Sequence, residues 1–222
     1  MKERIKKNHL FQLLGISFLA QAIIPLIVGL VFKSFESEDM SITMNNITNN
    51  ILTVNLTIIF WFIAAIFVIV LGIAMYLLAG HVNKTMGIIA LCLYLVEAML
   101  VLVGQTFVFG LLQASQLYIA GGDAELLNLG RILLSCRHFA GEMAMIPFGI
   151  GAILFFYLLM KEEIIPKWLA LYGLITAPLI MIGIPLTTFG VVVPIAVFAP
   201  YIPFEFFTGI YILVKYWKKP IL

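Results

Sequence analysis

Residues 56–79 read LTIIFWFIAAIFVIVLGIAMYLLA, a run of apolar side chains without a single Asp, Glu, Lys or Arg. A helix needs about 20 mainly apolar residues to cross the hydrocarbon core of a bilayer, so this stretch is long enough to span a membrane. It also lacks the regular alternation of polar and apolar residues that is typical of an outer-membrane barrel strand. The stretch therefore predicts a membrane-spanning helix and an all-α fold.

Similar runs recur along the whole chain. Of the 222 residues, 63% are hydrophobic and 11% are charged, which is more apolar surface than a soluble domain of this length needs. The first run follows KERIKK as in a signal peptide, but it continues past Ala20 and Ala22, so we expect an uncleaved first helix. We predict one polytopic domain over residues 1–222, with transmembrane helices at about 10–32, 56–79, 86–113, 132–160, 168–189 and 196–216.

The distribution of Lys and Arg predicts the orientation. Six spans place both termini on one side, and loops rich in Lys and Arg stay in the cytoplasm. The terminal side carries ten of these residues: Lys2, Arg4, Lys6, Lys7, Lys84, Lys161, Lys167, Lys215, Lys218 and Lys219. The opposite side carries Lys33, Arg131 and the longest loop, about residues 33–55, whose polarity suits an external loop folded partly onto the bundle. We therefore expect cytoplasmic termini.

Five ionisable residues lie inside the predicted spans: Glu97, Arg137, His138, Glu142 and Glu205. A charged side chain at the centre of a bilayer costs roughly 2.5–3.5 kcal/mol on the insertion scale. Asn, Gln or Ser would join helices at a lower desolvation cost, although polar residues in spans do serve that structural purpose. We therefore expect these five residues to face one another or a polar cavity rather than lipid.

Helical spacing extends this predicted cavity. His138 and Glu142 are four residues apart and share one helix face. Tyr94 lies three residues before Glu97, Tyr201 lies four residues before Glu205, and Gln21 adds a polar group to the first helix. The predicted set is Gln21, Tyr94, Glu97, Arg137, His138, Glu142, Tyr201 and Glu205.

Charge balance constrains what this cavity holds. Three glutamates against one arginine leave a net charge of 1 − 3 = −2 if all four are ionised. We expect Arg137 to compensate the glutamates of the third and sixth helices. The remaining negative charge can be offset in three ways: by protonation of one or more glutamates, by a protonated His138, or by a bound cation or cationic ligand.

Several stretches resemble a known family. They are LYLVEAMLVLVG in the third predicted helix, FGIGAILFFYLL in the fourth, IIPKWLALYGL after it, and PFEFFTGIYILVK in the last. The chain resembles the bacterial six-helix membrane proteins grouped as domain of unknown function 4386. The resemblance implies six helices in a bacterial cytoplasmic membrane. It also implies that Glu97 and Glu205 lie at positions where members of the family often have glutamate. The chain departs from the family pattern at Tyr94, where an arginine is common, and at the Arg137-His138 pair.

Three classes of function remain open. The polar spans favour binding of a small ligand, proton or cation, as in a transporter or a sensor. An intramembrane enzyme is the weaker alternative, with His138 and Glu142 as a metal-ligand or base pair and Glu97 or Glu205 completing the site. A structural or accessory subunit is the third. We expect the lipid bilayer as partner, and we expect no cofactor and no metal. The net charge of only +2 gives no reason to expect nucleic-acid binding. A homodimer is possible from the sequence.

Overall fold

The computed structural model describes the backbone from Lys2 to Trp217, and this part of the chain is helical and contains no strand. The predicted all-α fold is therefore confirmed. Lys218 and Lys219, which we assigned to the cytoplasmic side, lie outside the described residues. The elements are α1 (Lys2–Lys33), α2 (Met40–Asn49), α3 (Ile51–Ala79), α4 (Lys84–Gly121), α5 (Ala124–Lys161), α6 (Lys167–Thr188), the short 3₁₀ turn η1 (Ile195–Val197) and α7 (Tyr201–Trp217).

Contacts between neighbouring helices join the six longer helices into a closed ring in chain order. Helix α1 contacts α3, and α4, α5 and α6 follow as successive neighbours. Helix α7 packs against α6 and returns to α1, which closes the ring. Every long helix therefore presents one face to a shared interior, and that interior is where the polar residues of the spans are placed.

Five helical segments in the described part of the chain are long and apolar enough to cross a membrane. They are Asn8–Lys33, Ile51–Ala79, Lys84–Gly121, Ala124–Lys161 and Lys167–Thr188. Helix α7 has 17 residues, which is about 26 Å at 1.5 Å per residue. It begins at Tyr201 rather than at the predicted residue 196, because Pro200 has no N–H for a helix that passes through it.

The predicted external loop of about residues 33–55 is largely helical, which corrects that part of the prediction. Asp39 caps α2, since its carboxylate accepts a hydrogen bond of 2.8 Å from the Ser41 amide. Met40, Met44 and Ile47 then repeat at helical spacing and are buried against Leu111 and its neighbours on α4. Only this short apolar stripe, hidden among Asn and Thr residues, distinguishes α2 from a polar loop.

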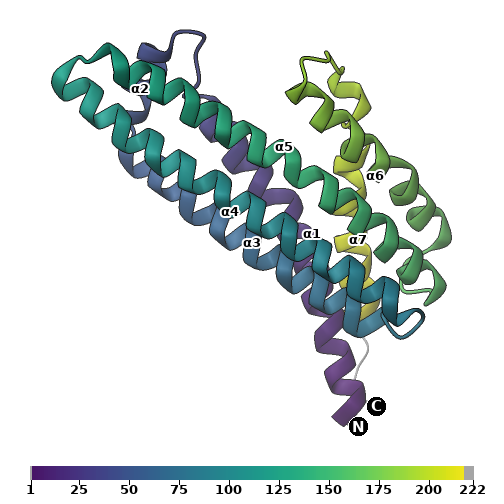
Figure 1. Ribbon diagram of the computed structural model, residues 1–222. Helices are drawn as coiled ribbons and strands as arrows, with labels where there is room; N and C mark the ends of the chain where they lie inside the picture. The colour runs from purple at the N-terminus through teal and green to yellow at the C-terminus, as the bar shows by residue number, and fades with distance from the viewer. Residues whose placement is uncertain (1, 218–222) are drawn as a thin grey trace.

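The predicted gap between residues 113 and 132 is also helical. Helix α4 continues to Gly121 and α5 starts at Ala124, so the two form a hairpin that extends well past the predicted span ends. Gly122 makes the turn with a φ of +69°, a conformation that glycine adopts readily, and Asp123 caps α5 by accepting from the Glu125 amide. Helix α2 covers this extension, as Figure 1 shows at the end remote from the N-terminus.

Two glycines bring α1 and α7 into close contact. A Cβ on Gly209 would lie 2.8 Å from Leu19 Cγ and 3.0 Å from the Gly15 carbonyl oxygen. A Cβ on Gly15 would lie 2.7 Å from Leu213 Cγ. Small residues of this kind let membrane helices pack backbone to backbone. The contact fixes α7 against α1 near the end of the molecule where α1 begins.

Replacing Gly209 with alanine should therefore destabilise the protein by about 1–3 kcal/mol, because the new methyl group overpacks the α1–α7 contact. The matched control is Gly29→Ala on α1, where a Cβ meets no atom within 4 Å. That variant should be neutral or more stable by up to about 1 kcal/mol. Thermal unfolding in detergent, followed by circular dichroism, measures both; equal melting of the two variants would contradict the close packing.

Candidate functional site

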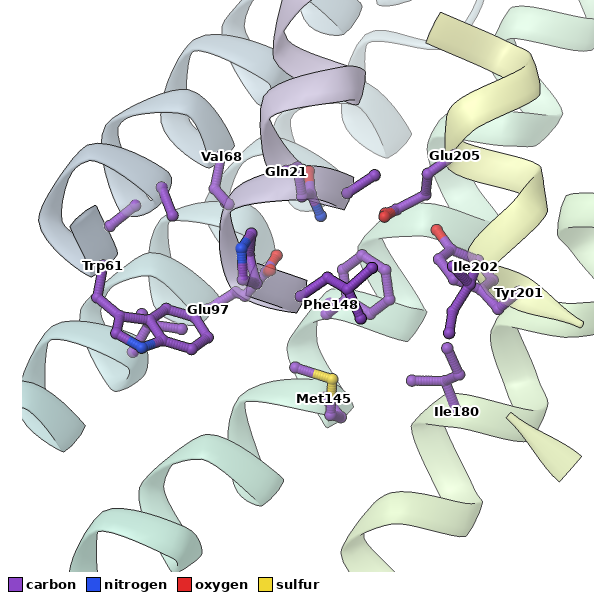
Figure 2. Close-up of a pocket in the computed structure, with 16 residues that line it drawn as sticks. Gln21, Trp61, Val68, Glu97, Met145, Phe148, Ile180, Tyr201, Ile202 and Glu205 are labelled. Carbon is purple, nitrogen blue, oxygen red and sulfur yellow. The ribbon is translucent and has the colours of Figure 1, made fainter. Parts of the chain in front are cut away.

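A cavity of about 310 Å³ lies inside the ring and receives side chains from all six long helices (Figure 2). We call it the carboxylate cavity because two glutamates line it. Its volume falls at the lower end of the range of about 300–1,000 Å³ that is typical of small-molecule sites. Its lining residues are Gln21, Ala22, Pro25, Leu26, Trp61, Ala64, Ala65, Val68, Glu97, Val101, Met145, Phe148, Ile180, Tyr201, Ile202 and Glu205.

The four polar residues of this lining are all buried. Glu97 is 4% exposed and Glu205 is 8% exposed. Figure 2 shows Glu97 and Glu205 reaching into the cavity from opposite sides, with Gln21 between them and Tyr201 beside Glu205. Glu97 Oε2 and Gln21 Oε1 have no hydrogen-bond partner among the described protein atoms. Polar oxygens therefore face this cavity with unused capacity to accept hydrogen bonds.

Local helix geometry explains this convergence. Tyr201 and Glu205 are four residues apart on α7 and share one face. Gln21 and Pro25 have the same spacing on α1. Pro25 has no N–H to donate to the Gln21 carbonyl one turn earlier, so α1 loses one intrahelical bond beside the cavity. The Gln21 carbonyl oxygen is thus a free backbone acceptor near the side-chain oxygens of Gln21 and Glu97.

A second cavity of about 290 Å³ adjoins the first on the side toward α2. We call it the Arg137 cavity. The two share Trp61, Val101 and Met145 as common walls. The lining of the Arg137 cavity is Trp61, Val101, Gly104, Gln105, Arg137, His138, Gly141, Glu142, Met145 and Ile184. Seven of the eight predicted site residues, all except Tyr94, are therefore divided between two neighbouring chambers.

Arg137 does not pair with Glu97 or Glu205 as predicted. Its Nη1 lies 3.4 Å from Glu36 Oε1, and His138 Nε2 lies 2.9 Å from the same oxygen. Lys33 Nζ lies 2.6 Å from the other oxygen of Glu36. Arg137 precedes Met145, a wall of the carboxylate cavity, by eight residues, or about 12 Å along the helix. That distance keeps its guanidinium at the α2 end of the bundle.

Glu36 is a charged centre that sequence reasoning missed. Burial alone would raise the pKa of its carboxyl, but hydrogen bonds with His138 and Lys33 and the charges of His138 and Arg137 outweigh burial. Together they lower the pKa of Glu36 from 4.5 to about 2. The sequence feature that could have indicated this contact is the position of Glu36. It follows the first predicted span directly, on the same side of the membrane as the start of the span that contains Arg137 and His138.

Two other predicted residues lie away from the carboxylate cavity. Glu142 lines the Arg137 cavity, and its carboxylate accepts a hydrogen bond from the Thr188 hydroxyl at the end of α6. Tyr94 is buried and packs its ring against Phe148 and Phe155 instead of lining either cavity. Of the predicted set, Gln21, Glu97, Tyr201 and Glu205 share one cavity, while Arg137, His138 and Glu142 share the other.

No group of three or more His, Cys, Asp or Glu side chains within the described residues is arranged to hold a metal ion. His138 faces Glu36, whereas Glu142 faces Thr188. His138 and Glu142 line the Arg137 cavity, whereas Glu97 and Glu205 line the carboxylate cavity.

The apolar helices and their buried interior define an integral membrane protein of the helical-bundle class. The family described as Domain of unknown function (DUF4386) matches residues 13–215, and the chain belongs to this family. The resemblance seen in the sequence is thereby confirmed. No curated protein and no solved structure matches the chain.

Replacing Glu36 with Gln should loosen the segment between α1 and α2, because the variant loses the charge-assisted contacts to Arg137, His138 and Lys33. Such contacts contribute about 1.5–3 kcal/mol, so amide hydrogen exchange over residues 34–39 should accelerate by roughly tenfold or more. Glu38→Gln is the matched control, since Glu38 is exposed in the same segment. Equal exchange in both variants would show that the Glu36 contacts do not hold the segment.

Acid should loosen the same segment in the unaltered protein. The pKa of Glu36 is lower in the folded chain than its ordinary 4.5, so its ionised form stabilises the fold above about pH 4.5. That stabilisation should be lost as the pH falls from 4.5 toward about 2. The protection factors of the amides of residues 34–39, which correct for the pH dependence of intrinsic exchange, should fall in this window in the unaltered protein and change less in Glu36→Gln.

Proposed function

We propose that this protein binds a proton or a small cation between Glu97 and Glu205, as a transporter or a membrane sensor does. The observation that carries the proposal is the convergence of two buried carboxylates on one cavity built by all six long helices. A site that every helix of a ring contacts is well placed to couple occupancy to helix movement. Glu97 lies on α4 and Glu205 lies on α7, far apart in the sequence, so local packing within one helix does not explain why they share a cavity.

Charge balance supports binding. Among the described residues, no Lys, Arg or His lines the carboxylate cavity, and Arg137 is held by Glu36 in the neighbouring chamber. Two carboxylates that share an apolar site repel each other when both are ionised. A proton or a bound cation relieves this repulsion. The pair therefore has the chemistry of a site that exchanges a proton for a cation.

The alternative that these residues only join helices is less well supported. Side chains that join membrane helices do so by bonding one another across the interface. Here Glu97 Oε2 and Gln21 Oε1 have no such partner among the described atoms, although both residues are buried. A purely structural role would leave the cost of burying these oxygens without compensation.

The proposal includes the membrane topology. Helix α7, with 17 residues, serves as the sixth span beside the five longer ones, because about 17 residues is the lower limit for crossing a bilayer. Both ends then lie on one side, together with Lys84, Lys161 and Lys167. The excess of Lys and Arg at that side favours the cytoplasm, in a bacterial cytoplasmic membrane. The α2 end faces outward.

Labelling with dicyclohexylcarbodiimide tests the site, because this apolar reagent reacts with protonated carboxyls in membranes. We expect modification of Glu97 or Glu205 in the protein in lipid nanodiscs, detected by peptide mass spectrometry. The rate should fall as the pH rises, since only the protonated form reacts. Addition of Na⁺ or K⁺ should slow the reaction if an inorganic cation occupies the site.

The matched controls are Glu97→Gln and Glu205→Gln, which remove the reactive groups, and Glu125→Gln, which changes an exposed residue at the start of α5. Glu125→Gln should label like the unaltered protein. Absence of label at both Glu97 and Glu205, or labelling that does not depend on pH, would contradict a proton-exchanging site.

A further inference from the structure

We infer that the ligand of the carboxylate cavity is an organic cation with an apolar body, which enters from the bilayer between α1 and α7. The inference rests on the proposed function, because it names the class of ligand that Glu97 and Glu205 would hold. Two features carry it: the chemistry of the cavity walls and the place where the cavity opens.

The walls are apolar apart from the acidic pair and two neutral polar groups. Of the 16 lining residues, Gln21, Glu97, Tyr201 and Glu205 are polar, which leaves 16 − 4 = 12 apolar ones. The volume of about 310 Å³ is roughly ten times the share of one water molecule in the liquid. Inorganic cations such as Ca²⁺ take six or more close oxygen ligands, whereas apolar side chains make up most of these walls. An apolar molecule with one positive group matches both the walls and the carboxylates.

Aromatic rings reinforce this match. Trp61, Phe148 and Tyr201 all line the cavity, and Figure 2 shows them around the space that Glu97 and Glu205 enter. The face of an aromatic ring attracts a cation, and it also buries apolar surface. A protonated amine or quaternary ammonium group would thus be held by carboxylate and ring together, while its hydrocarbon part fills the remaining volume.

The opening lies on the surface that a bilayer would cover. Leu26 on α1 is 41% exposed and Ile202 on α7 is 44% exposed, although both line the cavity. Helices α1 and α7 meet at Gly15 and Gly209 and diverge from there toward the α2 end (Figure 1). Leu26 lies eleven residues beyond Gly15, on the diverging part. An amphipathic cation dissolved in the bilayer therefore has a direct path to Glu205.

Binding of radiolabelled tetraphenylphosphonium to the full chain in lipid nanodiscs tests the inference. We expect saturable binding that weakens by at least about tenfold in Glu97→Gln or Glu205→Gln, since either change removes an attractive charge. Glu125→Gln should bind normally. Tetraphenylborate, an anion of the same shape, should show only the uptake of empty nanodiscs.

The path is tested by filling the opening. Leu26→Trp and Ile202→Trp should slow association of tetraphenylphosphonium several-fold. Leu30→Trp and Ile210→Trp are the matched controls, since these exposed residues lie on the same two helices and do not line the cavity. They should leave the association rate unchanged. Equal rates in all four variants would overturn the proposed path.

Competition in the unaltered protein makes the test independent of how well the variants fold. Tetraphenylphosphonium should slow carbodiimide labelling of Glu97 or Glu205, and tetraphenylborate should not. If Na⁺ or K⁺ slows labelling while tetraphenylphosphonium neither binds nor protects, the organic-cation inference fails and the proposed function stands. If neither glutamate is labelled, the proposed function fails as well.

Discussion

Burying a carboxylate inside an apolar bundle is the constraint on which the interior of this protein depends. Each ionised glutamate at the centre of a bilayer costs roughly 2.5–3.5 kcal/mol on the insertion scale, and Glu97 and Glu205 are both almost fully buried. They lie on α4 and α7, and the ring returns α7 to α1 through the Gly15–Gly209 contact. The fold thus concentrates its costliest groups in one place. It also places them at one cavity, where the proton or cation of the proposed function would reduce this cost.

The interior separates this acidic pair from the basic residues. Arg137 and His138 face Glu36 at the α2 end, and Lys33 completes that cluster. Had Arg137 reached Glu97 or Glu205, a permanent internal ion pair would have removed the need for an external positive charge. Glu36 engages Arg137 instead, and no basic side chain in the described part of the chain lines the carboxylate cavity. The shared walls Trp61, Val101 and Met145 keep the two chambers in contact.

Much of the helical architecture follows from hydrophobicity alone. The run at 56–79 lies within α3, and the run at 168–189 nearly coincides with α6. Helix α2 and the outer turns of α4 and α5 escaped prediction because they lie beyond the apolar runs, where Asn, Thr and Ser residues resemble a loop. Their helicity depends on the burial of Met40, Met44 and Ile47 against the α4–α5 hairpin. A tertiary contact of this kind has no signature in a hydropathy profile.

The composition of the cavities was predictable in part. Helical spacing placed Tyr201 with Glu205, the cost of an ionisable side chain in a membrane placed Glu97 with them, and Gln21 was added as a polar residue of the first helix; the structure brings these four together. The partner of Arg137 was predicted wrongly, since depth along α5 does not reveal how far a tilted helix carries a side chain from its neighbours. Apolar walls such as Trp61 and Phe148 also escaped prediction, because any apolar residue of a span is an equally good candidate from sequence.

We propose that Glu97 and Glu205 act as one coupled pair. Infrared titration of the carboxyl C=O stretch in lipid nanodiscs tests this claim most directly, with the unaltered protein compared against Glu97→Gln and Glu205→Gln. Removing either glutamate should move the titration midpoint of the other by at least about one pH unit, because groups that share a site titrate together. Midpoints that stay the same in the unaltered protein and in both variants would contradict it.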